Sequence, residues 1–374
     1  MDHTYIATCK FGLEGLVAEE LRVLGAHSVR TENARVFFSG NWDILCAANL
    51  WLRTGDRVFL LLGEFPATTF DELFEGVKAI EWEALLEKDA QFPVKGKTAK
   101  SILHSVSDCQ AITKKAIVER MKTKHKVNWF AETGCKYIVE VGLLDDVATI
   151  ALDASGAGLA RRGYRTLNVE APLSETLAAA IVDISRWRSD RPLWDPMCGS
   201  GTIPIEAAML ATHRAPGLTR DFALQEWGFL PNNLLNRARS SAQDAFTPSA
   251  PFEIMGSDID ETALELSRFH AKNAGFERIK FFHQDVREIK SQTPGGTILC
   301  NPPYGERLLD KKTVEQLYAQ MGAAFMALPN WKYCILSSHP QFERMFGKRA
   351  DKRRKLYNSS IVCQLYQYFY QKQK

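Results

Sequence analysis

Residues 298–304 read I-L-C-N-P-P-Y and constrain the fold more than any other part of this 374-residue chain. The short apolar run predicts a buried strand that stops at Asn301. Pro302 and Pro303 follow at once, and proline can neither continue a helix nor donate to a strand ladder. The chain must therefore leave its sheet rigidly and present polar groups at a strand's carboxyl end, where open α/β sheets bind ligands.

The groups in this stretch suit the methylation of an exocyclic amine, whose lone pair is delocalised into a base. The side-chain oxygen of Asn301 and the carbonyl of Pro302 can accept hydrogen bonds from such an amine. Tyr304 offers a flat face for stacking. We therefore predict Asn301, Pro302, Pro303 and Tyr304 as the catalytic segment. The alternative is a rigid turn that merely follows a strand.

A second motif precedes it in residues 192–202, P-L-W-D-P-M-C-G-S-G-T, which lead into a predicted helix over 203–211. A strand, a glycine-rich bend and a helix let a ligand approach the backbone closely. Pro204 stands where the dinucleotide fingerprint needs its third glycine, which argues against NAD or FAD. Asp195 instead favours S-adenosylmethionine (SAM), whose tail carries an ammonium group and no pyrophosphate.

Acids follow the next two predicted strands. Asp258 comes after the strand at 252–256 and is placed to accept hydrogen bonds from both hydroxyls of a ribose. Asp260 is expected to cap the following helix. Asp285 follows the third strand, where a helix or turn cap is its alternative role. Four motifs thus stand in the order of one catalytic fold, which argues against a merely structural turn at Asn301.

Composition restricts the remaining classes of function. The net charge of +3 is close to neutral, so a nucleic-acid partner must be argued from local patches. Eight scattered cysteines without a C-x-x-C pair suggest neither a zinc site nor a disulfide framework, and we expect no metal and a cytoplasmic protein with reduced thiols. No apolar run approaches membrane-spanning length, and residues 1–25 do not resemble a signal peptide.

The first half of the chain is predicted to be α+β. Residues 1–60 are read as strand, helix, strand, helix. Beyond them we expect strands at 91–94 and 101–106, a helix at 109–122 with Ile112, Ala116 and Val118 inward, and a hairpin around Asp145 and Asp146. In the sequence the many basic residues of this region are opposed only by Asp108 and Glu119. These basic residues could neutralise the phosphates of a nucleic acid or could form a solvated surface, and their charge alone favours neither reading.

The hairpin runs into D-A-S-G at 153–156 and R-R-G-Y-R at 161–165. Together with D-P-M-C-G-S-G-T and N-P-P-Y-G-E-R-L, these segments resemble the THUMP-domain RNA methyltransferases over essentially the whole chain. The resemblance is nearest to the bacterial enzymes that methylate guanine N2 in 23S rRNA. It implies a Rossmann-like class I methyltransferase domain with a seven-stranded mixed sheet at 166–374. A ferredoxin-like subdomain at 1–60 and a THUMP RNA-binding domain at 58–165 would precede it.

The resemblance also implies roles for residues. Asp285 would accept from the adenine amino group of SAM, with Ile259 and Val286 beside the ring. The complete expected cofactor set is Asp195, Pro196, Cys198, Gly199, Gly201, Thr202, Asp258, Ile259, Asp285, Val286 and Asn301. The expected RNA-binding residues are Lys114, Lys115, Lys122, Arg161, Arg162 and Arg165. For the three arginines the alternative is that they pin the joint between domains.

The resembled family also carries a long insertion after the glycine-rich motif, and this chain departs from the family's pattern at one position near residue 358. The insertion at 212–249 has a helical middle at 232–243 but no assigned role, and Ser359 stands where the family usually has glycine, which weakens the case for a tight turn. The function implied is SAM-dependent methylation of the exocyclic N2 of a guanosine in structured RNA, most readily 23S rRNA. A tRNA guanine-N2 methyltransferase and a non-catalytic RNA-binding assembly factor are the alternatives.

Overall fold

The computed structural model describes residues 2–126, 129–166, 173–291, 293, 295–304 and 311–370. The chain forms two compact units. Unit 1 comprises Met1–Cys9, Val17–Leu159 and Arg220–Ser240, and unit 2 comprises Lys10–Leu16, Ala160–Thr219 and Ser241–Lys374. Among the helices of the described ranges, none is long and apolar enough to cross a membrane.

Unit 1 is built on a seven-stranded sheet of order β2-β3-β1-β4-β7-β6-β5. Strands β5 and β6 run parallel, and the other neighbours run antiparallel. The strands are β1 His3–Cys9, β2 His27–Glu32, β3 Arg35–Gly40, β4 Gly55–Pro66, β5 Val94–Ala99, β6 Val139–Leu144 and β7 Val147–Asp153. The predicted hairpin is confirmed, because β6 and β7 meet through Asp145 and Asp146, both with positive φ, as two-residue hairpin turns of type I′ require.

The strands predicted at 91–94 and 101–106 were wrong, because the polar stretch between them is itself the strand β5. β5 lies at an edge of the sheet, where half of its backbone and one row of side chains meet water. Lys95 and Lys97 are therefore tolerated in alternation with Gly96 and Thr98. The strand lacks the apolar alternation by which strands are recognised.

Helices flank this sheet: α1 Glu14–Val23, α2 Trp42–Trp51, α3 Phe70–Ala79, the 3-10 turn η1 Trp82–Ala84 and α4 Val106–His125. A capping box between Thr69 and Glu72 begins α3. The expected inward face of α4 was only partly right, because Ala116 is buried but Ile112 and Val118 are half-exposed. The buried stripe instead consists of Cys109, Thr113, Ala116, Ile117 and Met121.

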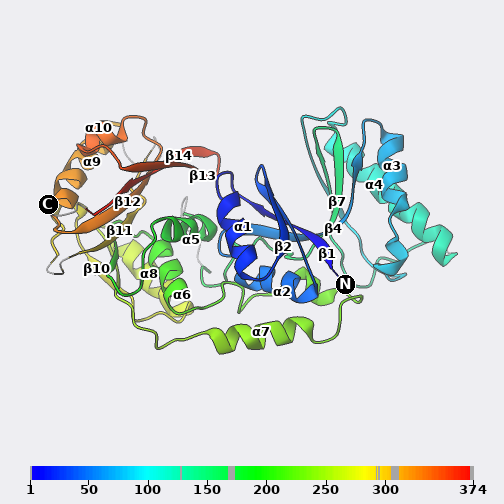
Figure 1. Ribbon diagram of the computed structural model, residues 1–374, viewed down its shortest axis with the longest axis horizontal. Helices are drawn as coiled ribbons and strands as arrows, with labels where there is room; N and C mark the ends of the chain where they lie inside the picture. The colour runs from blue at the N-terminus through cyan, green and yellow to red at the C-terminus, as the bar shows by residue number, and fades with distance from the viewer. Residues whose placement is uncertain are drawn as a thin grey trace. The chain divides into compact units, whose positions relative to one another are not determined.

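Unit 2 contains the expected seven-stranded mixed sheet, in the order β10-β9-β8-β11-β12-β14-β13. Only β14 runs antiparallel to its neighbours in this sheet. The strands are β8 Leu193–Asp195, β9 Ile254–Asp258, β10 Lys280–His283, β11 Gly296–Cys300, β12 Trp331–Ser337, β13 Lys352–Asn358 and β14 Ile361–Tyr368. This topology confirms the predicted class I methyltransferase fold (Figure 1).

The remaining elements are α5 Glu175–Ile184, α6 Thr202–Ala211, η2 Ala223–Glu226, α7 Leu234–Ala245, α8 Glu261–Asn273, η3 Val286–Glu288, α9 Lys311–Met326 and α10 Phe342–Phe346. Helix α7 confirms the helix expected within the insertion. Most of the insertion's middle, Arg220–Ser240, belongs to unit 1. Its Arg220 donates to the carbonyls of Ala157 and Gly158, at 2.5 and 2.8 Å, and so holds the turn after β7.

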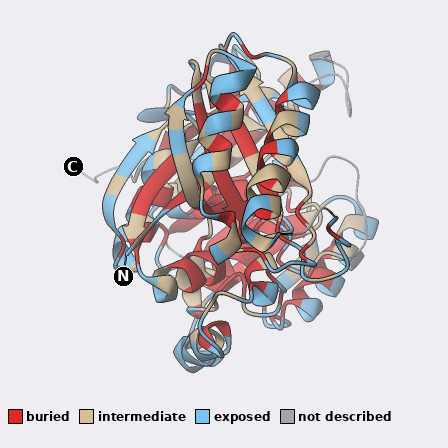
Figure 2. Ribbon diagram, turned by 90° about the vertical axis from the view of Figure 1, so that its right-hand side faces the viewer, coloured by how far each residue is buried: buried red, intermediate tan, exposed pale blue. Residues whose placement is uncertain are grey.

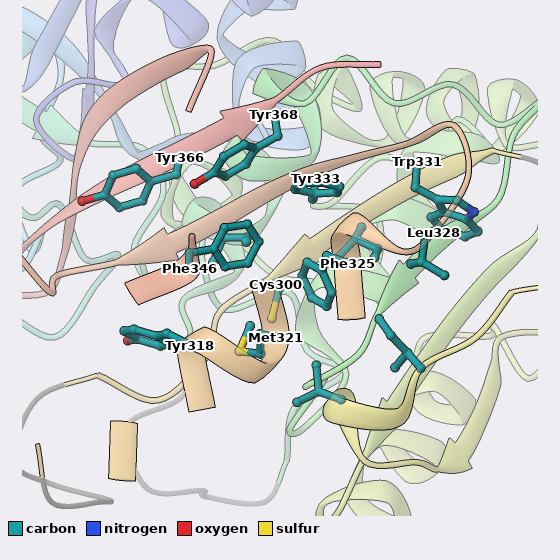
Figure 3. Close-up of a cluster of buried hydrophobic side chains, with 14 of the residues drawn as sticks. Cys300, Tyr318, Met321, Phe325, Leu328, Trp331, Tyr333, Phe346, Tyr366 and Tyr368 are labelled. Carbon is teal, nitrogen blue, oxygen red and sulfur yellow. The ribbon is translucent and has the colours of Figure 1, made fainter. Parts of the chain in front are cut away.

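A largely aromatic core packs one face of the unit 2 sheet against α9 and α10. Figure 3 shows Phe325 and Phe346 close to Tyr333, and Phe346 also lies against Tyr368 of the adjoining strand. Continuous burial of β11, whose five residues are all inaccessible, is typical of a parallel strand covered on both faces. The burial colours of Figure 2 show red residues concentrated on strands and inner helix faces. The sheet is therefore a rigid support for the loops at its carboxyl edge.

Candidate active site

A cavity of about 750 Å³ lies at the carboxyl ends of β8 to β11. β8 and β11 are neighbours, but the chain proceeds from β8 to β9 on one side and from β11 to β12 on the other. Such a switch point is where doubly wound sheets bind ligands. The wall includes the predicted residues Pro196, Gly199, Asp258, Ile259, Asp285, Val286, Asn301, Pro302, Pro303 and Tyr304.

Asn301 follows β11 directly and places an unsatisfied acceptor at this cavity. Its Oδ1 atom is buried and has no hydrogen-bond partner among the residues that the structure describes. A buried acceptor left unpaired costs about 1–3 kcal/mol. Asn301 lines the cavity, so an amine bound there can supply the missing donor.

The two prolines after Asn301 differ in what their carbonyls do. The Pro303 carbonyl accepts a hydrogen bond of 2.9 Å from the Tyr318 hydroxyl, which also lies 3.1 Å from Oγ of Ser337. Burial raises the pKa of Tyr318 to about 12, so its hydroxyl keeps the proton that it donates. Tyr318 therefore fixes the turn while the Pro302 carbonyl, on the cavity wall, stays the predicted acceptor for an amine.

Tyr304 is fixed in the wall by a residue that the sequence analysis missed. Asn358, the last residue of β13, donates a hydrogen bond of 2.7 Å from Nδ2 to the Tyr304 hydroxyl, and burial raises the pKa of that hydroxyl. Ser359 follows with a φ of 56°, so the turn expected of glycine is made by serine. The sequence signal for Asn358 was its place in R-K-L-Y-N at 354–358, a stretch that the resembled family also carries.

Asp258 ties the glycine-rich bend to β9. One carboxylate oxygen accepts from the Gly199 amide at 2.9 Å, and the other accepts from the Asp260 amide at 3.1 Å. Gly199 and Gly201 both have positive φ, and a Cβ on Gly201 would lie 3.2 Å from Phe281 and Ser267. A positive φ favours glycine at both positions, and at Gly201 a side chain would also crowd its neighbours. The helix-cap prediction for Asp260 is confirmed by its 2.9 Å bond from the Thr262 amide.

Four predicted cofactor residues lie behind the cavity wall rather than in it: Asp195, Cys198, Gly201 and Thr202. Asp195 is 2% exposed and accepts only weakly from the Met197 amide, at 3.3 Å. Burial raises its pKa well above the usual range, and the neighbouring Asp258 charge adds to the shift. Their contact with a cofactor stays a prediction.

Asp285 takes the alternative role weighed for it, since it caps η3. Its carboxylate accepts from both the amide and Nε of Arg287, each at 2.9 Å. The Arg287 guanidinium lowers the pKa of this carboxyl below its usual range. Asp285 nevertheless lines the cavity beside Val286, so its predicted contact with an adenine amino group stays open.

The RNA-binding prediction was wrong for Arg162. Its side chain is 1% exposed and lies 3.4 Å from a carboxylate oxygen of Glu206, which is fully buried and also accepts from Tyr164 at 3.3 Å. Arg165 contacts Glu175 at 3.4 Å and donates to Thr202 at 2.5 Å. These two arginines hold the segment after residue 160 to helices α5 and α6 within unit 2, and the alternative that they pin the joint between domains stays a prediction. Arg161 is exposed.

Acidic side chains neutralise part of the positive charge on the basic helix α4. Lys114 lies 2.7 Å from Glu132, and Lys122 lies 3.0 Å from Glu119, while Lys115 is exposed. Expecting only two opposing acids was an error, because folding brings further carboxylates from distant segments to this surface, namely Glu83, Glu132 and Glu140. RNA binding by these lysines stays a prediction.

Comparison with known proteins adds to this geometry. Residues 162–367 match the family model described as the RMKL-like methyltransferase domain. Residues 4–59 match the RlmL ferredoxin-like domain, and residues 67–153 match the THUMP domain. The named protein "Putative RNA methyltransferase YpsC" of Bacillus subtilis strain 168 is 46% identical over 370 residues, which cover 98% of this chain and 96% of its own.

Solved structures agree along the whole chain. SMU.472, crystallised in complex with SAH, is 42% identical with a TM-score of 0.95, over 100% of this chain and 99% of its own. A structure described as a predicted N6-adenine-specific DNA methylase from Listeria monocytogenes is 44% identical with a TM-score of 0.94, over 99% and 97%. The chain therefore belongs to the RMKL-like methyltransferase family, in the form that also carries a ferredoxin-like and a THUMP domain.

Proposed function

We propose that this protein is a SAM-dependent RNA methyltransferase that methylates an exocyclic amine, N2 of a guanosine. The observation that carries the proposal is the buried Oδ1 of Asn301, which has no hydrogen-bond partner within the described ranges and belongs to a residue of the cavity wall. An amide oxygen there can accept a hydrogen bond from an amine but is too weak a base to take up a proton, so the proton that the methylated amine loses passes to water.

The residues of the cavity fit SAM. Asp258 lies at the end of β9 with its carboxylate on the wall, where a ribose can donate to it. Ile259 is 57% exposed and lies beside Val286 in the same wall, so an apolar surface is available to an adenine ring. The relative crystallised with SAH, the demethylated product of SAM, supports this assignment. When bound, SAM supplies an electrophilic methyl group on a sulfonium.

The protein's own part in transfer is positioning and hydrogen bonding. Asn301 and the Pro302 carbonyl would accept from the amine, and Tyr304, held by Asn358, would stack on its base. Fixing two reactants in line replaces the entropy that an encounter in solution costs. A base in a helix must first leave its stack to reach the cavity.

The choice of RNA and of guanine N2 rests on relatives. The THUMP match at residues 67–153 and the name of the Bacillus relative favour RNA. Guanine N2 and 23S rRNA follow from the resemblance to the bacterial rRNA enzymes, with tRNA as the alternative substrate. The name of the Listeria structure favours adenine N6 in DNA, but a DNA enzyme would need a sequence-reading domain instead of a THUMP domain.

Calorimetry with SAM and transfer of labelled methyl groups to total RNA test the proposal together. We expect Asn301→Ala to abolish transfer with SAM affinity nearly unchanged, and Asp258→Ala to weaken SAM binding first. Wild-type turnover in both variants would overturn the site assignment. SAM binding by the wild-type protein without any turnover would favour the non-catalytic assembly factor.

Mass spectrometry of rRNA and tRNA nucleosides from a deletion strain identifies the product. Loss of one N2-methylguanosine from 23S rRNA is expected. Loss from tRNA would move the substrate to the alternative, and loss of N6-methyladenine from DNA would replace the proposal.

A further inference from the structure

We infer that a patch at the tip of the β13–β14 hairpin binds the unpaired nucleotide next to the target base. The patch consists of Phe11, Lys355, Tyr357 and Val362, and we name it the hairpin shelf. The inference rests on the proposed function and adds to it a second, stacking contact for RNA, on residues outside the cavity and outside the THUMP domain.

The shelf exposes large apolar side chains that belong to one unit. Phe11 is 51% exposed and Val362 is 48% exposed. The rings of Phe11 and Tyr357 lie 5.8 Å apart between centroids and are tilted by 55°. Tyr357 and Val362 are direct partners across the hairpin, so their side chains share one face of it. Exposed aromatic rings that are not packed away are available to a ligand.

The loop that carries Phe11 is held against β13. Gly12 has a φ of 87°, and a Cβ on it would lie 2.9 Å from the carbonyl oxygen of Lys355. The Arg354 guanidinium donates a hydrogen bond of 2.7 Å to the Gly12 carbonyl. Only glycine permits this close approach. The shelf is therefore ordered before any ligand arrives, which lowers the entropy lost on binding.

Charge identifies the partner as a nucleic-acid strand. The Lys355 ammonium lies 5.3 Å from the centroid of the Tyr357 ring, and residues 348–355 contain six basic residues against the single acid Asp351. Arg353 is paired with Glu343 at 2.7 Å, but Lys355, which lies on the same face of β13 as Tyr357, is exposed. Aromatic faces beside cations bind single strands, because bases stack on the rings while phosphates meet the charges.

The shelf adjoins the cavity through a single peptide bond. Asn358, the next residue after Tyr357, lines the cavity and holds Tyr304. Successive side chains of a strand point to opposite faces, so Tyr357 and Asn358 lie on opposite sides of the hairpin. An RNA strand that sends its target base into the cavity on one side would place the neighbouring base on the shelf at the other. The hairpin tip would thereby keep the two bases unstacked.

Photocrosslinking tests where RNA lies. The full-length protein is irradiated with a single-stranded RNA of roughly twelve nucleotides that contains 4-thiouridine, and the crosslinked tryptic peptides are identified by mass spectrometry. We expect crosslinks in the peptides covering residues 11–22 and 356–372. Absence of RNA binding, or crosslinks confined to other peptides, would overturn the inference, as would a partner protein found in place of RNA.

Substitution tests what the shelf contributes. Phe11→Ala should weaken binding of the same single strand by about tenfold, since stacking on one aromatic ring accounts for roughly 1–3 kcal/mol, and should leave duplex binding unchanged. Phe269→Ala, at a 42% exposed residue of α8, is the matched control and should have no effect. Lys355→Gln is a second variant, expected to weaken binding and to reduce its salt dependence.

Kinetics separate this inference from the proposed function. Phe11→Ala should raise KM for RNA while kcat and SAM affinity stay at wild-type values. If the wild-type protein transfers methyl groups and Phe11→Ala has the same KM for RNA, the shelf is overturned and the methyltransferase assignment stands. Crosslinks at the shelf in a wild-type protein that transfers no methyl group would support the shelf and overturn the methyltransferase assignment.

Discussion

The buried ion pair between Arg162 and Glu206 should stabilise the methyltransferase unit rather than contact RNA. The two side chains are 1% and 0% exposed and lie 3.4 Å apart. Arg162→Met keeps most of the volume and leaves the Glu206 carboxylate buried without this partner. Removing one member of a buried pair typically costs about 3–5 kcal/mol. At about 2–4 °C per kcal/mol for a unit of this size, the melting temperature should fall by roughly 6–20 °C.

Calorimetric unfolding of the full chain measures this loss. Arg161→Met is the matched control, because Arg161 is exposed and adjacent, and surface changes of this kind usually stay within about 0.5 kcal/mol. The double variant Arg162→Met, Glu206→Met should recover much of the stability, since both charges are then removed. An unchanged melting temperature in Arg162→Met, with RNA affinity reduced, would refute the structural role and restore the original RNA-binding prediction.

Three further predictions concern single contacts. Ser359→Gly should raise the free energy of unfolding by about 0.5–1 kcal/mol. Glycine adopts a φ of 56° without the steric cost that serine has there, and this gain exceeds the additional chain entropy that glycine loses on folding. A lower urea midpoint would contradict this. Hydrogen bonds from Arg120 lower the pKa of Glu83 to about 2, so this pair stabilises the protein fully above pH 4.5, the ordinary pKa of a glutamate, and progressively less as the pH falls toward 2. As the pH falls from 4.5 toward 2, the urea midpoint of Arg120→Gln should therefore fall less than that of the wild type. An equal fall in both proteins would show that the pair does not stabilise the fold. Tyr318→Phe removes the hydrogen bond to the Pro303 carbonyl, which should cost about 1 kcal/mol of stability and slow methyl transfer at unchanged SAM affinity; full transfer would show that the turn needs no such support.

The parallel part of the fold was predictable because each motif stood at the end of an apolar run. β11 is buried along its whole length, and the following Asn301 lies in the cavity as the prolines predicted. The glycines of the bend and Asp258 could be predicted, because the local backbone favours those residue types at those positions. Local requirements of this kind do not depend on distant partners, which is why about half of the residues in the cavity's wall could be predicted.

What could not be predicted depends on partners that are distant along the chain. β5 lacks an apolar face because it lies at a sheet edge, and no local pattern reports an edge position. Arg162 looks like any other basic residue until Glu206, 44 positions later, is folded against it. Asn358 gains its role only because β13 brings it to Tyr304. Each case needs tertiary contacts, and tertiary context overrides local preference.

A crystal structure of this chain with S-adenosylhomocysteine is the most direct test of the central claim that one cavity holds both SAM and the Asn301 acceptor. The account predicts the ligand inside the cavity, with its ribose on Asp258 and with Asn301 in the wall of the space that the ligand leaves free. A ligand bound elsewhere, or an Asn301 amide turned away from an open cavity, would contradict it.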